Sequence, residues 1–92
     1  MILRPLTNGA VSGSHTLIVK SGIIGGVLIT TDNTNATTVT VRREGSTGMP
    51  IINIATVTTM WIGGPFGLDD SETAHVVVSG TGASAQIYEW VP

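Results

Sequence analysis

The chain has 92 residues, no cysteine and a formal net charge of −2. This length predicts a single domain with a modest core, and the lack of cysteine excludes disulfides and thiolate metal sites. Only four residues are Lys or Arg, which argues against the clustered basic surface that nucleic acids require. Charged residues make up 11% of the chain, against about a quarter in a typical soluble domain. Much of the surface must therefore be Thr, Ser, Gly and aliphatic side chains, a composition suited to burial against partner molecules.

No run of about 18 apolar residues predicts a membrane span. The first residues, Met-Ile-Leu-Arg-Pro, are not followed by the apolar core and small-residue cleavage site of a signal peptide. We therefore expect no membrane partner and assembly in a cytoplasm.

Residues 1–6 are expected to form a short edge strand or an arm that lies on a neighbour, because Pro5 cannot donate to a strand ladder. A polar, Gly-containing loop and a strand over residues 15–20 follow. Residues 22–44 are then interpreted as a hairpin, in which an Asn- and Asp-rich turn at 31–36 joins two strands.

The first strand of this predicted hairpin carries aliphatic side chains on both faces, because strand side chains alternate. Strict alternation places Ile23, Val27 and Ile29 on one side, and Ile24 and Leu28 on the other. A strand of this kind is either covered on both sides within its own chain or has one face against another chain. The second strand, with valines at 39 and 41 and threonines between them, predicts one buried face.

The remaining sequence predicts further strands separated by Gly-rich turns, over residues 49–55, 56–62, 73–79 and 84–91, with a long loop at 63–72. No helical periodicity is present, and β-branched residues dominate the strands. Seven or eight short strands predict an all-β fold, an antiparallel β-sandwich that is jelly-roll-like. It comprises one domain over residues 1–92 with an N-terminal arm at 1–6.

Few residues are candidates for chemistry, and each has an ordinary structural interpretation that we favour. His15 and His75 would need a further ligand to hold a metal. The acidic run at residues 69–72 lacks the spacing of an EF-hand and is interpreted as a solvated connection. No nucleophile elbow or phosphate-binding glycine loop is present. We therefore predict no catalytic, cofactor or metal site, and no enzyme.

The aromatic residues are Trp61, Phe66, Tyr88 and Trp90. One or two of them are expected in the core. Aromatic residues and Met are also enriched in subunit interfaces, where charges are depleted. A tryptophan in a subunit contact is therefore the competing interpretation.

The order of these pieces resembles small structural proteins of tailed-phage virions. The resemblance consists of a Gly/Ile-rich strand at 22–29, an Asn/Thr/Ala turn at 33–36 and a "TVTV" strand at 38–41. A Gly/Thr loop and aliphatic strand at 45–54 and a closing aromatic strand at 86–90 complete it. The resemblance covers most of the chain. The chain departs from the family pattern in Arg42-Arg43-Glu44 and in the loop at 63–72. It implies a virion component with a jelly-roll-like sandwich, either a capsid decoration (cement) protein, a head-fibre base or a small tail component.

The leading hypothesis is a capsid decoration protein on the virion exterior that binds the major capsid protein as a homo-oligomer, with a trimer favoured over a dimer. The alternative is a tail or head-fibre component that binds a host glycan or protein, with an exposed tryptophan beside Asp or Glu. The candidate interface residues are Met1, Ile2, Leu3, Arg4, Pro5, Met60, Trp61, Pro65, Phe66 and Trp90.

Overall fold

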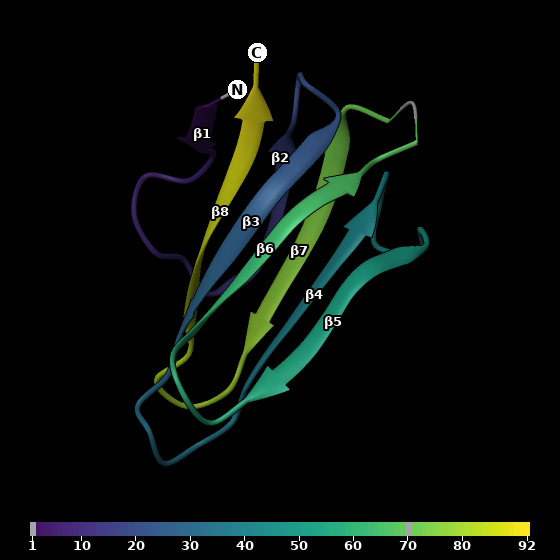
Figure 1. Cartoon of the computed structure of the whole chain (residues 1–92). Helices are drawn as coiled ribbons and strands as arrows, with labels where there is room; N and C mark the ends of the chain where they lie inside the picture. Colours follow the sequence, from purple (N-terminus) through teal and green to yellow (C-terminus); the bar gives the residue numbers. More distant parts are fainter. Residues whose placement is uncertain (1, 70) are drawn as a thin grey trace.

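The computed structural model describes residues 2–69 and 71–92, which form eight β-strands. They are β1 (Ile2–Pro5), β2 (Gly13–Ile18), β3 (Ile23–Thr30), β4 (Thr37–Arg43), β5 (Pro50–Thr56), β6 (Met60–Gly67), β7 (Thr73–Ser79) and β8 (Ser84–Val91). All pairings are antiparallel and divide the strands between two sheets packed face to face (Figure 1). The predicted all-β sandwich is confirmed.

The strand order is β1-β8-β3-β6 in one sheet and β2-β7-β4-β5 in the other. Strand β1 pairs with β8, β2 with β7, β3 with β6 and β4 with β5. The chain therefore behaves as one long hairpin that is rolled into two layers, which is the topology of an eight-stranded jelly roll.

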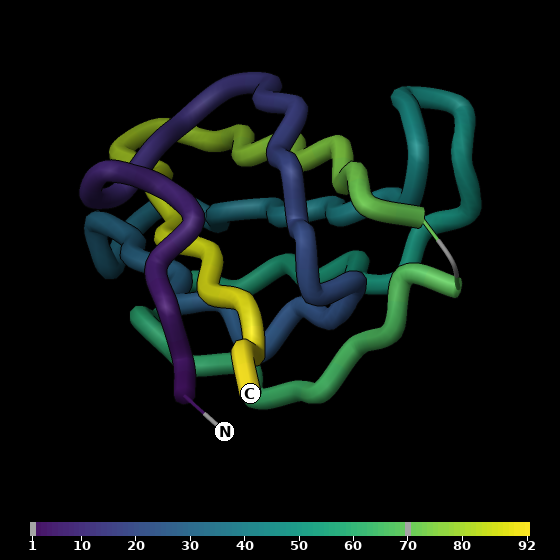
Figure 2. The backbone as a smooth tube through the Cα atoms, turned by 90° about the horizontal axis from the view of Figure 1, so that it is seen from above, coloured from purple at the N-terminus to yellow at the C-terminus, as the bar shows by residue number. Residues whose placement is uncertain are grey.

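The two ends of the chain lie side by side, because the first and last strands are neighbours (Figures 1 and 2). Ile2–Pro5 forms an edge strand on β8 of its own chain, as one of the two sequence interpretations predicted. Met1 lies outside the described residues. Edge placement suits Pro5, which has no N–H to offer to a second neighbour.

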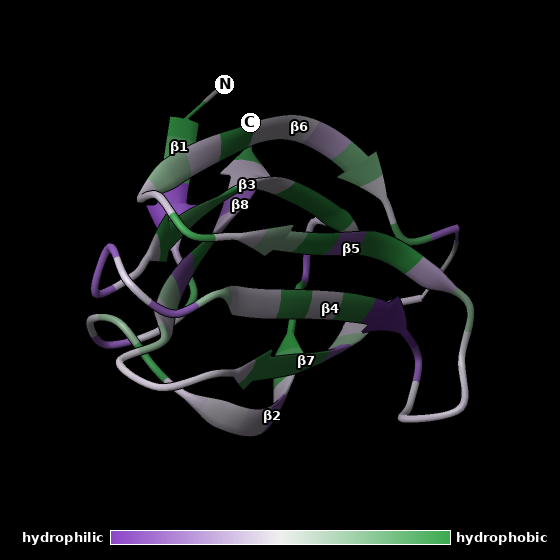
Figure 3. Ribbon diagram, turned by 90° about the horizontal axis from the view of Figure 1, so that it is seen from below, coloured by the Kyte–Doolittle hydropathy of each residue, from purple (hydrophilic) through white to green (hydrophobic). Residues whose placement is uncertain are grey.

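The space between the sheets is filled by aliphatic side chains. In Figure 3, green bands alternate with paler or purple ones along β4 and β5, as expected for strands with one face turned inward. No aromatic residue is fully buried; of the one or two expected in the core, Phe66 alone packs against it, and it is only partly buried. The buried apolar residues are Val19, Ile24, Val27, Ile29, Val39, Val41, Ile52, Leu68, Ala74, Val76, Val78, Ala83, Ala85 and Ile87.

The predicted hairpin at residues 22–44 is wrong, although both of its strands exist. Strand β3 pairs with β6 and β8, whereas β4 pairs with β5 and β7 in the opposite sheet. The turn between them carries the chain from one layer to the other. The Asp32 carboxylate shapes this turn by accepting backbone N–H bonds from Thr34 (2.9 Å) and Asn35 (2.7 Å).

The predicted faces of the first strand also need correction. In the pairing with β8, Ile24 and Gly26 face the consecutive residues Glu89 and Tyr88, so β3 bulges by one residue at this point. The extra residue changes the phase of alternation, so that Ile24 joins Val27 and Ile29 in the core. Leu28 remains on the outer face and is only partly buried.

The predicted loop at residues 63–72 is shorter than expected. Strand β6 continues through Gly63 and Pro65 to Gly67, and begins at Met60 rather than at residue 56. Pro65 has no register partner in β3, and β6 is the edge of its sheet, so the missing N–H of Pro65 is tolerated there.

Candidate interaction surfaces

The described residues on the outer face of the β1-β8-β3-β6 sheet carry no charged side chain. Buried residues on these strands identify the inner face, and the alternate positions therefore point outward. We call this outer surface the aromatic face. Its residues are Leu3, Pro5, Ile23, Gly25, Gly26, Leu28, Thr30, Trp61, Gly63, Pro65, Gly67, Ser84, Gln86, Tyr88 and Trp90.

Two glycines of β3 create the space in which the large side chains of this face lie. A Cβ atom at Gly26 would stand 2.4 Å from ring carbons of Trp61, and one at Gly25 would stand 3.0 Å from a ring carbon of Trp90. Both distances are shorter than a van der Waals contact. The indole of Trp61 therefore rests on the backbone of the neighbouring strand, an arrangement in which aromatic rings cover sheet glycines.

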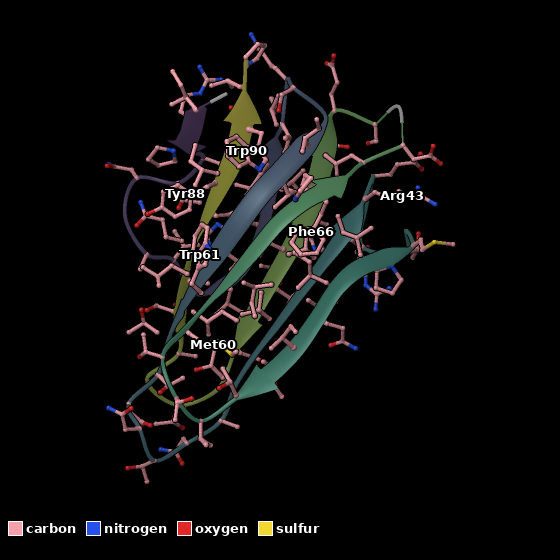
Figure 4. The ribbon with its side chains drawn as sticks, in the orientation of Figure 1. Arg43, Met60, Trp61, Phe66, Tyr88 and Trp90 are labelled. Atoms are coloured by element: carbon pink, nitrogen blue, oxygen red, sulfur yellow. The ribbon has the colours of Figure 1, made fainter. Side chains whose placement is uncertain are left out.

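The aromatic rings contact one another across the strands. Trp61 and Tyr88 meet edge to face, with ring centroids 5.5 Å apart and planes at 70°. Figure 4 shows Trp61, Tyr88 and Trp90 gathered over β8 and β3. Trp61 is nevertheless 45% exposed, so this ordered cluster presents apolar area to solvent. Within the described part of the chain, the buried Nε1–H of Trp90 has no acceptor, and its burial costs stability unless another molecule supplies one.

The outer face of the second sheet has a different chemistry. It carries threonines at 16, 38 and 40 together with Arg42, Asn53 and His75. Hydroxyl contacts link Thr16 to His75 (3.3 Å) and Thr40 to Asn53 (3.3 Å). Ile18 and Val77 also lie on this face, which we call the polar face because most of its side chains can hydrogen-bond to water, as on the exposed side of an antiparallel sheet. The two outer faces of the sandwich are therefore not equivalent.

A buried carboxylate joins the N-terminal strand to the rest of the sheet. The side chain of Glu89 is 3% exposed and accepts hydrogen bonds from Arg4 Nε (3.1 Å) and Arg4 Nη2 (2.6 Å). Ser21 donates its hydroxyl to the other carboxylate oxygen (3.0 Å). We call this group the Arg4–Glu89 latch. The sequence analysis did not predict this latch. The signal was that Glu89 alternates with Ala85 and Ile87, which places its carboxylate on the inner face of the strand.

The electrostatics of Glu89 reflect two opposing effects. Burial alone would raise the pKa of its carboxyl, because a charged group loses hydration. The hydrogen bonds from Arg4 and Ser21 and the positive charge of Arg4 outweigh this, so the pKa lies below its ordinary value. Glu89 is therefore ionised when folded, and its charge is used to hold β1 in place.

The other predicted interface residues are divided between the two sides of β6. Pro65 is exposed on the aromatic face, whereas Phe66 points inward and packs partly against the core. Met60 lies at the start of β6 and is 36% exposed. Figure 4 places Met60 and Phe66 along β6, on the side toward β4 and β5. Ile2 is exposed on β1, while Arg4 is engaged in the latch.

The residues considered for metal binding do not converge. His75 pairs with Thr16 on the outer face of β2 and β7, so the adjacent His15 must point to the opposite face. Asp69 forms an ion pair with Arg43 (2.9 Å). Over residues 2–69 and 71–92, no group of three or more His, Cys, Asp or Glu side chains could hold a metal ion.

Within the same described ranges, no helix is long and apolar enough to cross a bilayer. Comparison with protein-family models, curated proteins and solved structures gave no match to this chain. The features that bear on function are therefore the fold, the two unlike outer faces and the resemblance in sequence pattern.

Proposed function

We propose that this chain is a structural virion protein of a tailed phage, a capsid decoration protein that binds the outer capsid shell as an oligomer and stabilises it. The observation that carries the proposal is the ordered, uncharged aromatic face of a small jelly roll. Large exposed apolar surfaces on soluble domains mark interaction sites. The partners we assign to the chain are the major capsid protein and further copies of itself.

Jelly rolls serve as viral capsid domains, as lectins and as cupins, and the side chains of this chain favour the first use. A cupin-type centre needs inward-pointing ligands that converge on one metal. Here the two histidines point to opposite faces of one sheet. The aromatic face lacks charged groups, as the fully buried core of a protein–protein interface commonly does.

The mechanism of stabilisation would be linkage. A protein that binds only the assembled, expanded shell shifts the equilibrium towards that shell, by about 2.7 kcal/mol per site at a hundredfold excess over Kd. An oligomer that bridges neighbouring capsid subunits adds avidity without strong single contacts. The exposed edge strand β1, with Ile2 at its outer end, is the segment that we assign to the capsid contact.

The test is sedimentation of the purified protein with expanded, empty heads that lack it. We expect saturable co-sedimentation and heads that resist heating to a higher temperature. Unexpanded heads and a β-sandwich of similar size and charge are the controls. A chain that stays in the supernatant with expanded heads would refute the proposal.

A tail or fibre component that binds a host glycan is the second candidate, and the pose of Trp61 is the observation that favours it. An indole fixed on Gly26 with one side exposed could stack on a sugar ring. Among residues 2–69 and 71–92, the aromatic face does not offer the acidic neighbour that such a site was expected to use, since Glu89 points inward and is engaged by Arg4 and Ser21. Binding on a glycan array, lost in Trp61→Ala, would move this candidate to first place.

A further inference from the structure

We propose that the aromatic face packs against the same face of other copies of this chain, in a closed dimer or trimer with this face at the symmetry axis. The inference rests on the proposed function, because it identifies the contact that would hold the oligomer together. The polar face and the strand β1 edge would then stay available for other partners.

The first support is the position of the aromatic residues. Small domains normally use such residues to fill their own cores, because each can bury 150–250 Å². In this chain the fully buried core is aliphatic, whereas Trp61, Tyr88 and Trp90 lie on the outer face. The glycines beneath them hold the rings against the sheet, so the cluster is already ordered before any partner arrives. A pre-ordered apolar surface loses little conformational entropy on association.

The second support is the lack of charge on the aromatic face, which makes this face compatible with a second copy of itself. In a symmetric contact, residues close to the symmetry axis meet their own copies, so a charge there is brought near a like charge, which is unfavourable. The aromatic face carries none, so it is compatible with itself. The opposite face carries Arg42 and His75, so the same arrangement through that face would bring a charged side chain into the contact.

The third support separates a second copy from a glycan. Sugar hydroxyls require several polar side chains around the stacking ring. On the aromatic face the polar groups are the side chains of Thr30, Ser84 and Gln86 and the hydroxyl of Tyr88. Gln86 stands directly opposite Leu28, so the middle of the face is mainly apolar. Such a composition resembles the core of a subunit interface more closely than a sugar site.

The experiment measures mass by light scattering and sedimentation velocity over a concentration series up to about 0.1 mM. We expect a discrete dimer or trimer, with tryptophan emission moving to shorter wavelength as the oligomer forms. Trp61→Glu should weaken association at least about tenfold, because it places like charges together at the interface. Gln86→Glu adds the same charge with almost no change in shape and should also weaken association. It provides the test if Trp61→Glu fails to fold.

The matched control is Ile18→Glu. Ile18 is 64% exposed and belongs to the opposite sheet, so this variant should keep the mass of the original protein. Circular dichroism and thermal melting verify that each variant is folded. A monomer throughout the series would overturn the inference, as would an oligomer that both face variants leave intact.

These outcomes can be separated from a failure of the proposed function. If the protein is an oligomer, dissociates in the face variants and does not bind expanded heads, the inference is supported and decoration is refuted. A monomer that binds heads refutes the inference, and decoration then survives with the aromatic face turned to the capsid.

Discussion

The Arg4–Glu89 latch gives a prediction for the variant Arg4→Met, which keeps the length of the side chain and removes its charge. Breaking a fully buried ion pair costs about 3–5 kcal/mol, whereas an exposed pair contributes about 0–1 kcal/mol. Here the side chain of Glu89 is 3% exposed but that of Arg4 is 56% exposed, so water can partly replace the guanidinium. We therefore expect an intermediate loss of about 1–3 kcal/mol.

The assay is thermal and denaturant unfolding at neutral pH. A loss of this size lowers Tm by roughly 5–20 °C in a domain of this length. The matched control is Arg43→Met, which removes an ion pair to the largely exposed Asp69. Its cost should stay below about 1 kcal/mol. Equal losses in the two variants would refute the argument that burial makes the latch important.

The same latch predicts a pH dependence with a definite sign. Because the pKa of Glu89 is lower in the folded than in the unfolded chain, its stabilisation is present above the unfolded value of about 4.5 and is lost as pH falls through the folded value. The stability difference between the original protein and Arg4→Met should therefore be constant near neutral pH and shrink below about pH 4.5. A difference that persists unchanged at pH 3 would contradict this assignment.

Two further variants test the outer face and the layer-crossing turn. Gly26→Ala should displace the Trp61 ring, shift its emission to longer wavelength and destabilise the fold by about 1–3 kcal/mol. Gly45→Ala, at an open position, is its control. Similar tryptophan emission spectra for the two variants would contradict the packing of the Trp61 ring on Gly26. Asp32→Ala should lower Tm and speed hydrogen exchange at the Asn35 amide, because the carboxylate that caps it is lost. Asp32→Asn should retain most of the stability, since Asn also forms such turns. An equal loss of Tm in Asp32→Ala and Asp32→Asn would contradict the role assigned to this side chain in the turn.

The strands and their inner faces could be predicted wherever the alternation is regular. Strands β7 and β8 have the predicted bounds, and Val39 and Val41 of β4 are buried as expected. The sheet to which each strand belongs could not be predicted from local pattern. The turn around Asp32 has the composition of a hairpin turn, yet it crosses between layers. Turn chemistry describes the local backbone, whereas partner choice depends on strands far away in sequence.

The aromatic face was only partly predictable, for two physical reasons. The Gly- and Pro-rich composition of residues 63–67 is typical of a loop, but outward glycines and an edge proline are compatible with a strand. The bulge in β3 then changes which residues point outward. No local signal in the sequence shows whether a bulge occurs at Gly25 or Gly26. The exposure of Trp61 follows from both features together.

The position of the aromatic residues connects the stability of this small domain to its assembly. A sandwich core is about 10 Å thick, and here Val, Ile, Leu and Ala fill its fully buried part, with Phe66 packed against them and only partly buried. The apolar area of Trp61, Tyr88 and Leu28 is therefore only partly used in the single chain. If copies associate through this area, folding and association are linked, and Tm must rise with protein concentration. A Tm that rises for the original protein and for Ile18→Glu, but is independent of concentration in Gln86→Glu, would locate that linkage on the aromatic face.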